Sequence, residues 1–411
     1  MSLLIKVSYF LLLTYTVVAG PSDQYATQLT KNLFNNLKKI AADPTKILFG
    51  QHKANYAGAG GGHTPYKTHN HDGQFVGWEF SIDMAQKKLD GELCDIKQMT
   101  GEFPAFTGYD FYQFESNWME IVTHLVKKSY SRGMVVAMSW HMHNFADGGD
   151  PWHWGSENRM VKEMLPGGRH QHHYMAMLDK IANWANELKD SKGQHIPIIF
   201  RPFHESNGKW FWWGLGNSIG NTPQDLKDIY RYTVKYLRDT KHVHNFLYAF
   251  SPNSGYKSMM QDGSSQKSYM AAYPGDDYVD ILGLDDYSLV LQSSTLQNFV
   301  DTVAGLVKMA DRTGKIPALT EIGAPNNHLN EKSYYNFWIS NVLNPLKGIG
   351  VQANDAVKRI AYINTWTNQC GTNCKIFTPY HGHPAETDFI NFYKDPMMAF
   401  ENYVKQHNMY A

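Results

Sequence analysis

The sequence is poor in cysteine, carries no excess of either charge and contains a single long apolar run. Because the 38 basic side chains balance the 38 acidic ones, we expect neither nucleic acid nor an anionic membrane as a partner. The three cysteines lack the second pair that a zinc site needs. No Asn-x-Ser/Thr sequence occurs, so N-glycosylation is not expected.

The apolar run, Val7–Val18, follows Lys6 and ends in front of Ala19. This pattern predicts a signal peptide, 1–19, that is cleaved after Ala19. The run is too short to span a bilayer comfortably, and no other segment reaches spanning length. We therefore expect a soluble protein, secreted or held in a digestive or lysosome-like compartment, whose residues 20–411 form one catalytic domain.

Two of the cysteines, Cys370 and Cys374, lie four residues apart in a polar loop. In an oxidising compartment they could form a small disulfide loop, although the distance between their Cα atoms could still forbid it. Cys94 is far away in sequence, and we expect it to be a buried free thiol.

Short apolar runs alternate with helix-like stretches along the whole chain, which predicts a single (β/α)8 barrel of the TIM type. Near-continuous apolar runs are typical of strands covered on both faces. The expected strands are 47–51, 104–109, 134–140, 196–202, 246–252, 279–284, 316–320 and 360–365. One helix is predicted in detail, with Thr222 as its N-cap, Pro223 at its first position and Asp225 in its first turn.

Polar residues gather after these runs, and in a barrel all such strand ends face one side, where active sites lie. They are Gln51, His52, Asp110, His141, His143, His204, Glu205, Asn253, Asp285, Tyr287, Glu321 and Trp366. Long loops after the strands, above all 143–174, are expected to wall an open cleft.

Glu205 and Glu321 each end an apolar run, and Trp210, Trp212 and Trp213 follow Glu205 closely. Flat aromatic rings suit the faces of sugar rings, and 14% of the chain is aromatic. Two carboxylates at two strand ends, beside such platforms, indicate a retaining glycoside hydrolase.

The motifs Arg201-Pro-Phe-His-Glu205, Gly208-Lys-Trp-Phe-Trp-Trp-Gly214 and Thr320-Glu-Ile-Gly323 resemble glycoside hydrolase family 26, mainly β-mannanases. Further matching segments are Gly50-Gln-His52, Pro104-Ala-Phe-Thr-Gly-Tyr-Asp110, Ser139-Trp-His141, Gly283-Leu-Asp-Asp-Tyr287 and Phe392-Tyr-Lys-Asp-Pro396. The resemblance implies a (β/α)8 barrel that hydrolyses β-1,4-mannan or glucomannan inside the chain with net retention. It also implies Glu205 as acid/base and Glu321 as nucleophile, with Arg201 able to keep Glu321 ionised.

The same resemblance implies a set of sugar-binding residues: His141, His143, His204, Trp210, Trp213, Asp285, Tyr287 and Trp366. Tyr287 is expected to hydrogen-bond the nucleophile, and Trp366 to form the floor under the sugar at subsite −1. His204 could bind the sugar 2-hydroxyl, hold Glu321 ionised or simply fill the core. Asp110 is expected to support loops, and Trp213 could be structural. Thr367 departs from well-studied relatives that carry arginine there.

Two alternatives stay open: a related glycanase acting on mixed-linkage glucan or β-1,3-xylan, and a non-catalytic carbohydrate-binding barrel. A histidine-rich metal site is a weaker hypothesis, since loops without fixed geometry seldom form closed sites. It rests on two groups, His63, His69, His71 and Asp72, and His170, His172 and His173. We expect no cofactor, no resident metal and a monomer.

Overall fold

The computed structural model describes residues 20–60, 67–69, 75–81, 83, 92–114, 118–254, 260, 268–324, 328–370 and 374–411. The predicted signal peptide, 1–19, lies outside the described residues. So do His63, His71 and Asp72 of the first histidine-rich group, together with the side chain of His69.

Eight parallel strands form a closed barrel, because the last strand pairs with the first. Their order around the barrel follows the sequence, which confirms the predicted fold class. The bounds agree with the predicted ones to within two residues. The strands are β1 (Ile47–His52), β5 (Phe106–Asp110), β6 (Val135–Ser139), β7 (Ile198–Arg201), β8 (Phe246–Phe250), β9 (Ile281–Asp286), β10 (Ile316–Ile322) and β11 (Tyr362–Thr365).

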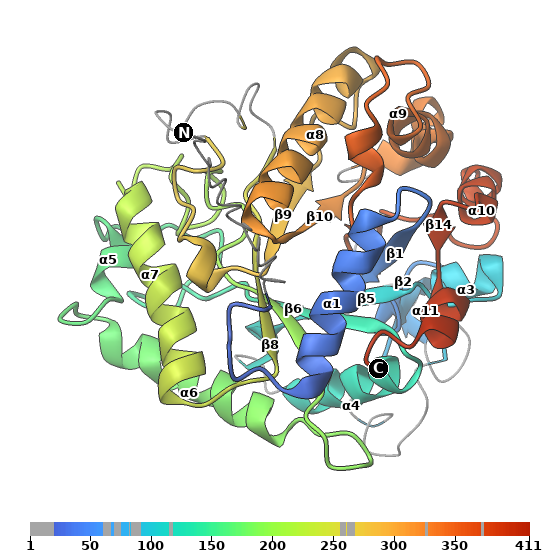
Figure 1. The fold of residues 1–411 in the computed structure, drawn as a ribbon. Coiled ribbons are helices and arrows are strands. Elements are labelled where there is room, and N and C mark those ends of the chain that lie inside the picture. Colours follow the sequence, from blue (N-terminus) through green and yellow to red (C-terminus); the bar gives the residue numbers. More distant parts are fainter. Residues whose placement is uncertain are drawn as a thin grey trace, which may run out of the picture.

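Helices surround the barrel, as Figure 1 shows. They are α1 (Gln28–Ala42), α3 (Asp95–Thr100), α4 (Met119–Ser131), α5 (Met160–Glu163), α6 (Gln171–Glu187), α7 (Pro223–Lys235), α8 (Leu296–Thr313), α9 (Asn344–Leu346), α10 (Glu386–Lys394) and α11 (Glu401–His407). Helix α1 covers the N-terminal end of the barrel, where Leu33, Phe34 and Leu37 pack in one cluster with Leu48 and Leu247 of the strands. The candidate site lies at the opposite end of the barrel, where the strands have their C-terminal ends.

Helix α7 begins as its sequence predicts. Thr222 accepts a hydrogen bond from the Asp225 backbone N–H, and the Asp225 carboxylate accepts one from the Thr222 N–H. This capping box satisfies two backbone donors that the first helical turn leaves unpaired. The apolar face, which includes Leu226, Ile229 and Val234, is buried against the rest of the domain.

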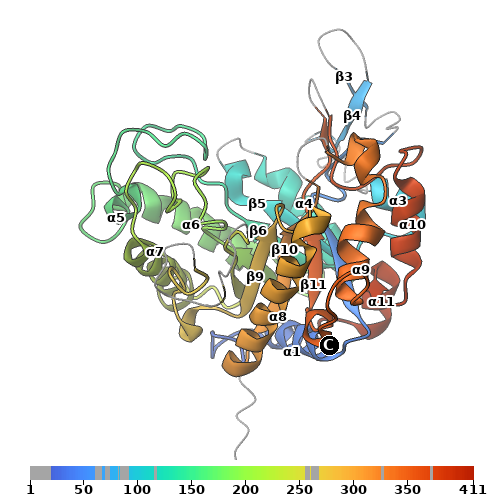
Figure 2. The same cartoon turned by 90° about the horizontal axis from the view of Figure 1, so that it is seen from above.

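Two small antiparallel sheets were not predicted from the sequence. One joins β2 (Ala57–Gly58), β4 (Phe75–Glu79) and β3 (Lys67–His69), and Figure 2 shows β3 and β4 at the end of the molecule opposite α1. The other pairs β12 (Gln369–Cys370) with β13 (Cys374–Lys375). A further short strand, β14 (Met398–Ala399), pairs with β1 outside the closed barrel.

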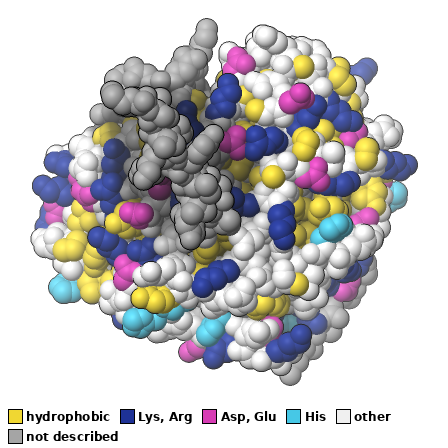
Figure 3. Space-filling model, viewed as in Figure 1, with side chains coloured by type: hydrophobic (Ala, Val, Ile, Leu, Met, Phe, Trp, Pro, Cys, Tyr) yellow, Lys and Arg dark blue, Asp and Glu magenta, His cyan; other side chains and the backbone are white. Residues whose placement is uncertain are grey.

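The surface shows no segregation of charge on the face drawn in Figure 3, where acidic and basic side chains are interspersed. Among the described residues no helix has both the length and the apolar character needed to cross a membrane. The segment 143–174, expected as a long loop, contains α5 and the start of α6 at Gln171.

Candidate active site

The two candidate catalytic glutamates extend from opposite parts of the barrel wall. Glu321 lies within β10, just after an irregularity in the pairing of β10 with β9. Glu205 lies in the turn that follows β7, with its backbone at φ 53°, and Phe203 before it has φ 52°. A left-handed conformation costs a residue with a side chain on the order of 1–3 kcal/mol, and such strain collects at functional sites. The Glu205 N–H is held by the carbonyl of Ser251, at 2.8 Å.

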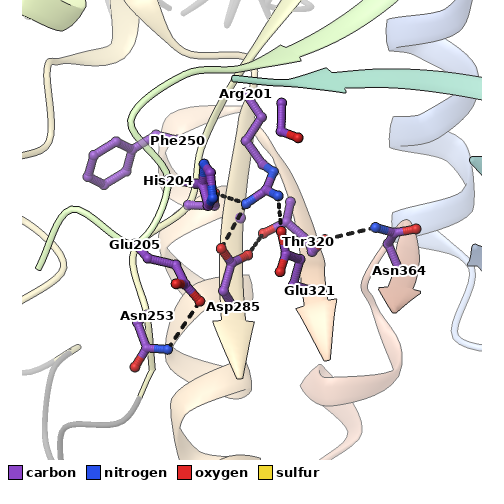
Figure 4. Close-up of polar contacts among 12 residues, drawn as sticks. Arg201, His204, Glu205, Phe250, Asn253, Asp285, Thr320, Glu321 and Asn364 are labelled. Atoms are coloured by element: carbon purple, nitrogen blue, oxygen red, sulfur yellow. Dashed lines mark hydrogen bonds and ion pairs between the residues drawn. The ribbon is translucent and has the colours of Figure 1, made fainter. Parts of the chain in front are cut away.

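Three carboxylates meet at the mouth of the barrel. Oxygens of Glu205, Asp285 and Glu321 lie within 4.8 Å of one another, and all three residues are buried. Arg201, on β7, donates to Asp285 at 2.8 Å and also to Glu321, as Figure 4 shows. Among the described residues this is the one acidic or histidine group spaced to hold a metal ion, and the Arg201 guanidinium already supplies a cation to two of its members.

Arg201 donates hydrogen bonds to Asp285 and Glu321 but not to the third carboxyl group, that of Glu205. Burial, followed by the negative charge of Glu321, raises the pKa of Glu205 to about 7. The Trp210 indole N–H donates to its Oε2, and the Asn253 amide lies 3.5 Å from its Oε1. The carboxyl group is therefore positioned by two donors while it can still carry a proton near neutral pH.

Glu321 is held by donors on both of its oxygens. Arg201 contacts Oε1, and the Tyr287 phenol donates to Oε2 at 2.9 Å. This is the contact expected of Tyr287. Burial, with the nearby Glu321 charge, raises the pKa of Tyr287 well above its usual value, so the phenol stays a donor.

The contacts of Asp285 are those of a residue that supports the site, and its expected contact with the sugar stays a prediction. Its side chain is fully buried below the site, and its oxygens accept from Arg201 and from the Thr320 hydroxyl at 2.6 Å. Burial raises the pKa of Asp285, although the charge of Arg201 opposes that effect. Asp285 thus positions Arg201, and its bond to Thr320 could not be predicted from the sequence.

A chain of polar contacts links Asp110, His141 and His204. Asp110 accepts the His141 backbone N–H at 2.9 Å and contacts Nδ1 of the same ring. Nε2 of His141 lies 3.2 Å from Nε2 of His204. Burial would raise the pKa of Asp110, but the contacts with His141 and Ser139 outweigh it and hold that pKa well below the usual range. Asp110 therefore orients His141, a more specific task than supporting loops.

His204 is buried, and its ring is neutral near pH 7. Burial, followed by the charge of Arg201, lowers its pKa well below the usual value. Its ring packs edge-on against His141, with centroids 4.5 Å apart, and its Nε2 pairs with that residue and not with Glu321. His204 thus packs in the wall of the site without a contact to Glu321, and its binding of the sugar 2-hydroxyl stays a prediction.

Trp366, directly after β11, is one of the residues that line a cavity of 290 Å³. Its ring stacks on His52, with centroids 4.3 Å apart and planes 13° apart. His141 and Trp152 also line this cavity. His52 is the last residue of β1 and lies at the end of the barrel where the sequence predicted it.

The tryptophans after Glu205 divide into two kinds. Trp210 is partly exposed beside Glu205, whereas Trp212 and Trp213 are fully buried. Trp213 donates to the His204 carbonyl at 2.9 Å, and Trp212 donates to the Met142 carbonyl at 2.8 Å. The burial of Trp213 favours the structural role left open for it, and its contact with a sugar ring stays a prediction.

The remaining predicted residues lie near the rim or away from it. His143 is partly buried, its Nδ1 lies 3.1 Å from the Gly148 carbonyl, and its ring packs against Tyr112. A disulfide joins Cys370 to Cys374, and Cys94 is a buried free cysteine. In the second histidine group, His170 contacts Glu157 at 2.9 Å and packs beside His173.

The sequence profile of glycosyl hydrolase family 26 matches residues 22–353, most of the chain. The chain belongs to glycosyl hydrolase family 26. This family 26 chain is 33% identical over 317 residues to a mannan endo-1,4-β-mannosidase of Bifidobacterium adolescentis, covering 72% of this chain and 30% of the relative. It is 30% identical over 244 residues to a mannan endo-1,4-β-mannosidase of Bacillus subtilis, covering 55% of this chain and 61% of the relative. The chain thus spans less than two thirds of both curated relatives.

Among solved structures, the family 26 chain is similar to the catalytic domain of an endo-β-1,4-mannanase of Bacillus sp. JAMB-750. The two share 32% identity with a TM-score of 0.79, over 95% of this chain and 96% of the other. The similarity therefore covers the barrel together with its loops.

Proposed function

We propose that this chain is a retaining endo-β-1,4-mannanase, with Glu205 as acid/base and Glu321 as nucleophile. The proposal rests on one observation: two carboxyl groups with different surroundings lie close together. Oxygens of the two lie within 4.8 Å, Glu205 has a pKa of about 7, and Glu321 is bound to Arg201. This separation is near the roughly 5–5.5 Å of retaining enzymes and well below the roughly 6.5–9.5 Å of inverting ones.

In the first step, protonated Glu205 gives its proton to the glycosidic oxygen while Glu321 attacks the anomeric carbon. The C–O bond to the leaving chain breaks, and a covalent glycosyl–Glu321 ester forms. Arg201 and Tyr287 hold the attacking carboxylate in place. The indole N–H of Trp210 and the amide of Asn253 direct the Glu205 carboxyl toward the leaving oxygen.

In the second step, Glu205 is ionised and takes a proton from a water that attacks the same carbon. The ester bond to Glu321 breaks, and the two inversions leave the product with its original configuration. Since Glu205 acts first as acid and then as base, a pKa near neutrality serves both steps.

The relatives' names support β-mannan as the substrate, and glucomannan follows from the resemblance of the motifs. The experiment is to measure reducing-sugar release from mannan, glucomannan, mixed-linkage glucan and β-1,3-xylan with one preparation. Preferential release from mannan is expected. A preference for mixed-linkage glucan or β-1,3-xylan would replace the mannanase assignment with the related glycanase, and binding without any release would indicate a non-catalytic barrel.

We further propose that the protein is secreted as a monomer after removal of residues 1–19. Support comes from the apolar run Val7–Val18 in front of Ala19 and from the Cys370–Cys374 disulfide, which is typical of oxidising compartments. Terminal sequencing of the mature protein is expected to begin at Gly20, and size-exclusion chromatography is expected to give the mass of one chain.

A further inference from the structure

A cavity of 770 Å³ lies at the end of the barrel opposite Glu205 and Glu321. Its volume is within the range of ligand sites in proteins. Ser131 and Gly133 of its lining precede β6, and Ile196 precedes β7, so the cavity lies where these two strands begin. No residue of the candidate active site lines it. A ligand bound here therefore leaves the proposed active site free.

Two elements supply the polar lining of this cavity, helix α4 and the turn between α6 and β7. The contribution of α4 is His124, Lys127, Lys128 and Ser131. Their spacing of i, i+3, i+4 and i+7 puts all four on one face of the helix. The turn contributes Lys189, Asp190, Ser191, Lys192 and Gln194. The lining thus holds four lysines and one aspartate, a local excess of positive charge in a chain that has no net charge.

Asp190, the one carboxylate among the described residues of the lining, is held within its own turn. Its Oδ1 accepts the backbone N–H groups of Lys192 and Gln194, at 2.8 and 2.9 Å. Burial, followed by the charge of Asp190 and a hydrogen bond to it, raises the pKa of Tyr130 to about 12, so this phenol stays a donor. These contacts fix the turn and leave its lysines to face the cavity.

Three of the four lysines have no carboxylate partner. Within the part of the chain that the structure describes, Lys127, Lys189 and Lys192 form no ion pair, and all three are exposed. Like charges gathered around one cavity repel one another, and an anion bound among them relieves that repulsion. The cavity therefore favours an anionic ligand.

The rest of the lining is largely apolar or aromatic. Leu29 and Ile196 line the cavity beside Tyr130 and Tyr410, whose ring centroids lie 4.7 Å apart. Asn32 of α1 donates to the Tyr410 carbonyl at 2.9 Å and so holds the end of the chain, which lies beside α4 in Figure 1. The walls are therefore fixed before a ligand binds. Their apolar surface suits one face of a sugar ring, as the lysines suit its acidic substituent.

The kind of cation in the lining narrows the class of ligand. Arginine, with its planar fork, is suited to bind one phosphate or carboxylate through two parallel hydrogen bonds, whereas lysine is a mobile point charge. All the permanent cations of this lining are lysines, and they come from two separate elements. This arrangement suits a ligand whose negative charges repeat along a chain. A polyuronate has such charges, together with an apolar ring face on every unit.

We propose that this cavity binds an acidic oligosaccharide, a run of uronic acid units whose carboxylates lie against Lys127, Lys189 and Lys192. The inference goes beyond the proposed function, because no bond is made or broken at this site. Binding here holds the protein on an acidic polysaccharide while the opposite end of the barrel stays open to its own substrate.

The test is titration calorimetry of the full chain with trigalacturonate, a chain of three galacturonic acid units. One molecule is expected to bind per chain, and binding should weaken as salt is added, because the Debye length falls to about 10 Å at 0.1 M. Replacing Lys127, Lys189 and Lys192 together by glutamine is expected to weaken binding on the order of tenfold or more, since each exposed ion pair contributes up to about fivefold in affinity.

A matched control changes the net charge equally at a distance from the cavity. It replaces Lys162 of α5, Lys308 of α8 and Lys394 of α10 by glutamine, three exposed lysines that do not line the cavity. This control is expected to bind trigalacturonate as the wild type does, and circular dichroism establishes that both variants are folded. Equal losses in the two variants, or no binding to the wild type, would overturn the proposal.

Two further ligands separate this site from its alternatives. An excess of mannotetraose, which occupies the proposed active site, should not displace trigalacturonate, and displacement would overturn the separate site. A peptide of three glutamates carries the same charge without sugar rings and is expected to bind more weakly. Equal binding of the peptide would overturn the assignment to a glycan. None of these measurements depends on hydrolysis, so their outcome is independent of the catalytic proposal.

Discussion

Trp210 donates its indole N–H to the carboxylate of Glu205, five residues before it. This hydrogen bond favours the ionised form of Glu205 and so opposes the effect of burial, which raises the pKa to about 7. The balance between the hydrogen bond from Trp210 and the effect of burial sets the pH at which Glu205, the proposed acid, loses its proton.

Replacing Trp210 by phenylalanine is expected to raise the pKa of Glu205, because the donor to the charged form is lost while burial remains. The alkaline limb of the kcat/KM profile should therefore move to higher pH. In the wild type that limb should lie near pH 7, with activity falling as pH rises through it. A limb that moves to lower pH in the variant, or that lies several units from 7 in the wild type, would contradict the assignment of Glu205.

Removing Arg201 should destabilise the folded protein. Arg201→Met leaves the buried carboxylates of Asp285 and Glu321 without their cation, and breaking a buried pair in this way costs about 3–5 kcal/mol. The loss should be larger at pH 8 than at pH 5, because protonation of the abandoned carboxyls at lower pH relieves the penalty. Denaturant unfolding at both pH values measures it, with Arg201→Lys as the variant that keeps the charge. A loss independent of pH would show that the carboxylates are not the cause.

Asp110 and His141 should act as one unit in catalysis. Asp110→Asn weakens the contact to Nδ1 of His141 and is expected to lower kcat/KM. In the double variant with His141→Ala the two effects should not add, with a coupling of about 0.5–3 kcal/mol for residues in direct contact. Strict additivity in this double-mutant cycle would show that Asp110 acts by another route.

The N-cap of α7 offers a stability test that leaves the site untouched. Thr222→Ala removes the hydroxyl that accepts the Asp225 N–H and is expected to cost about 1 kcal/mol of unfolding free energy, with kcat/KM unchanged. Thr222→Ser keeps the hydroxyl and should retain most of that stability. Equal losses in the two variants, measured by denaturant titration, would assign the effect to the lost methyl group instead.

The eight barrel strands could be predicted because strands covered on both faces need long apolar runs, and the bounds followed from where polar residues resume. The same rule predicts that Glu205, Glu321 and Tyr287 lie on one face of the barrel. The rule does not predict which way a side chain points within a turn. Trp213 and Trp210 are near neighbours in one aromatic segment, yet one is fully buried and the other contacts Glu205.

Hydrogen-bond partners that lie far apart in the sequence could not be predicted either. Asp285 was identified as part of the site, but its burial under Arg201 and its bond to Thr320 depend on how β7, β9 and β10 pair. The sheet of β2, β3 and β4 was missed because its strands are short and carry no long apolar run.

The most direct test of the account is the configuration of the first product released by hydrolysis, followed by proton NMR before mutarotation. Two glutamates whose oxygens lie within 4.8 Å leave no room for an attacking water between them and require a covalent intermediate. The account predicts that the β anomer appears first and the α anomer only later, at the rate of mutarotation. Initial release of the α anomer would contradict it.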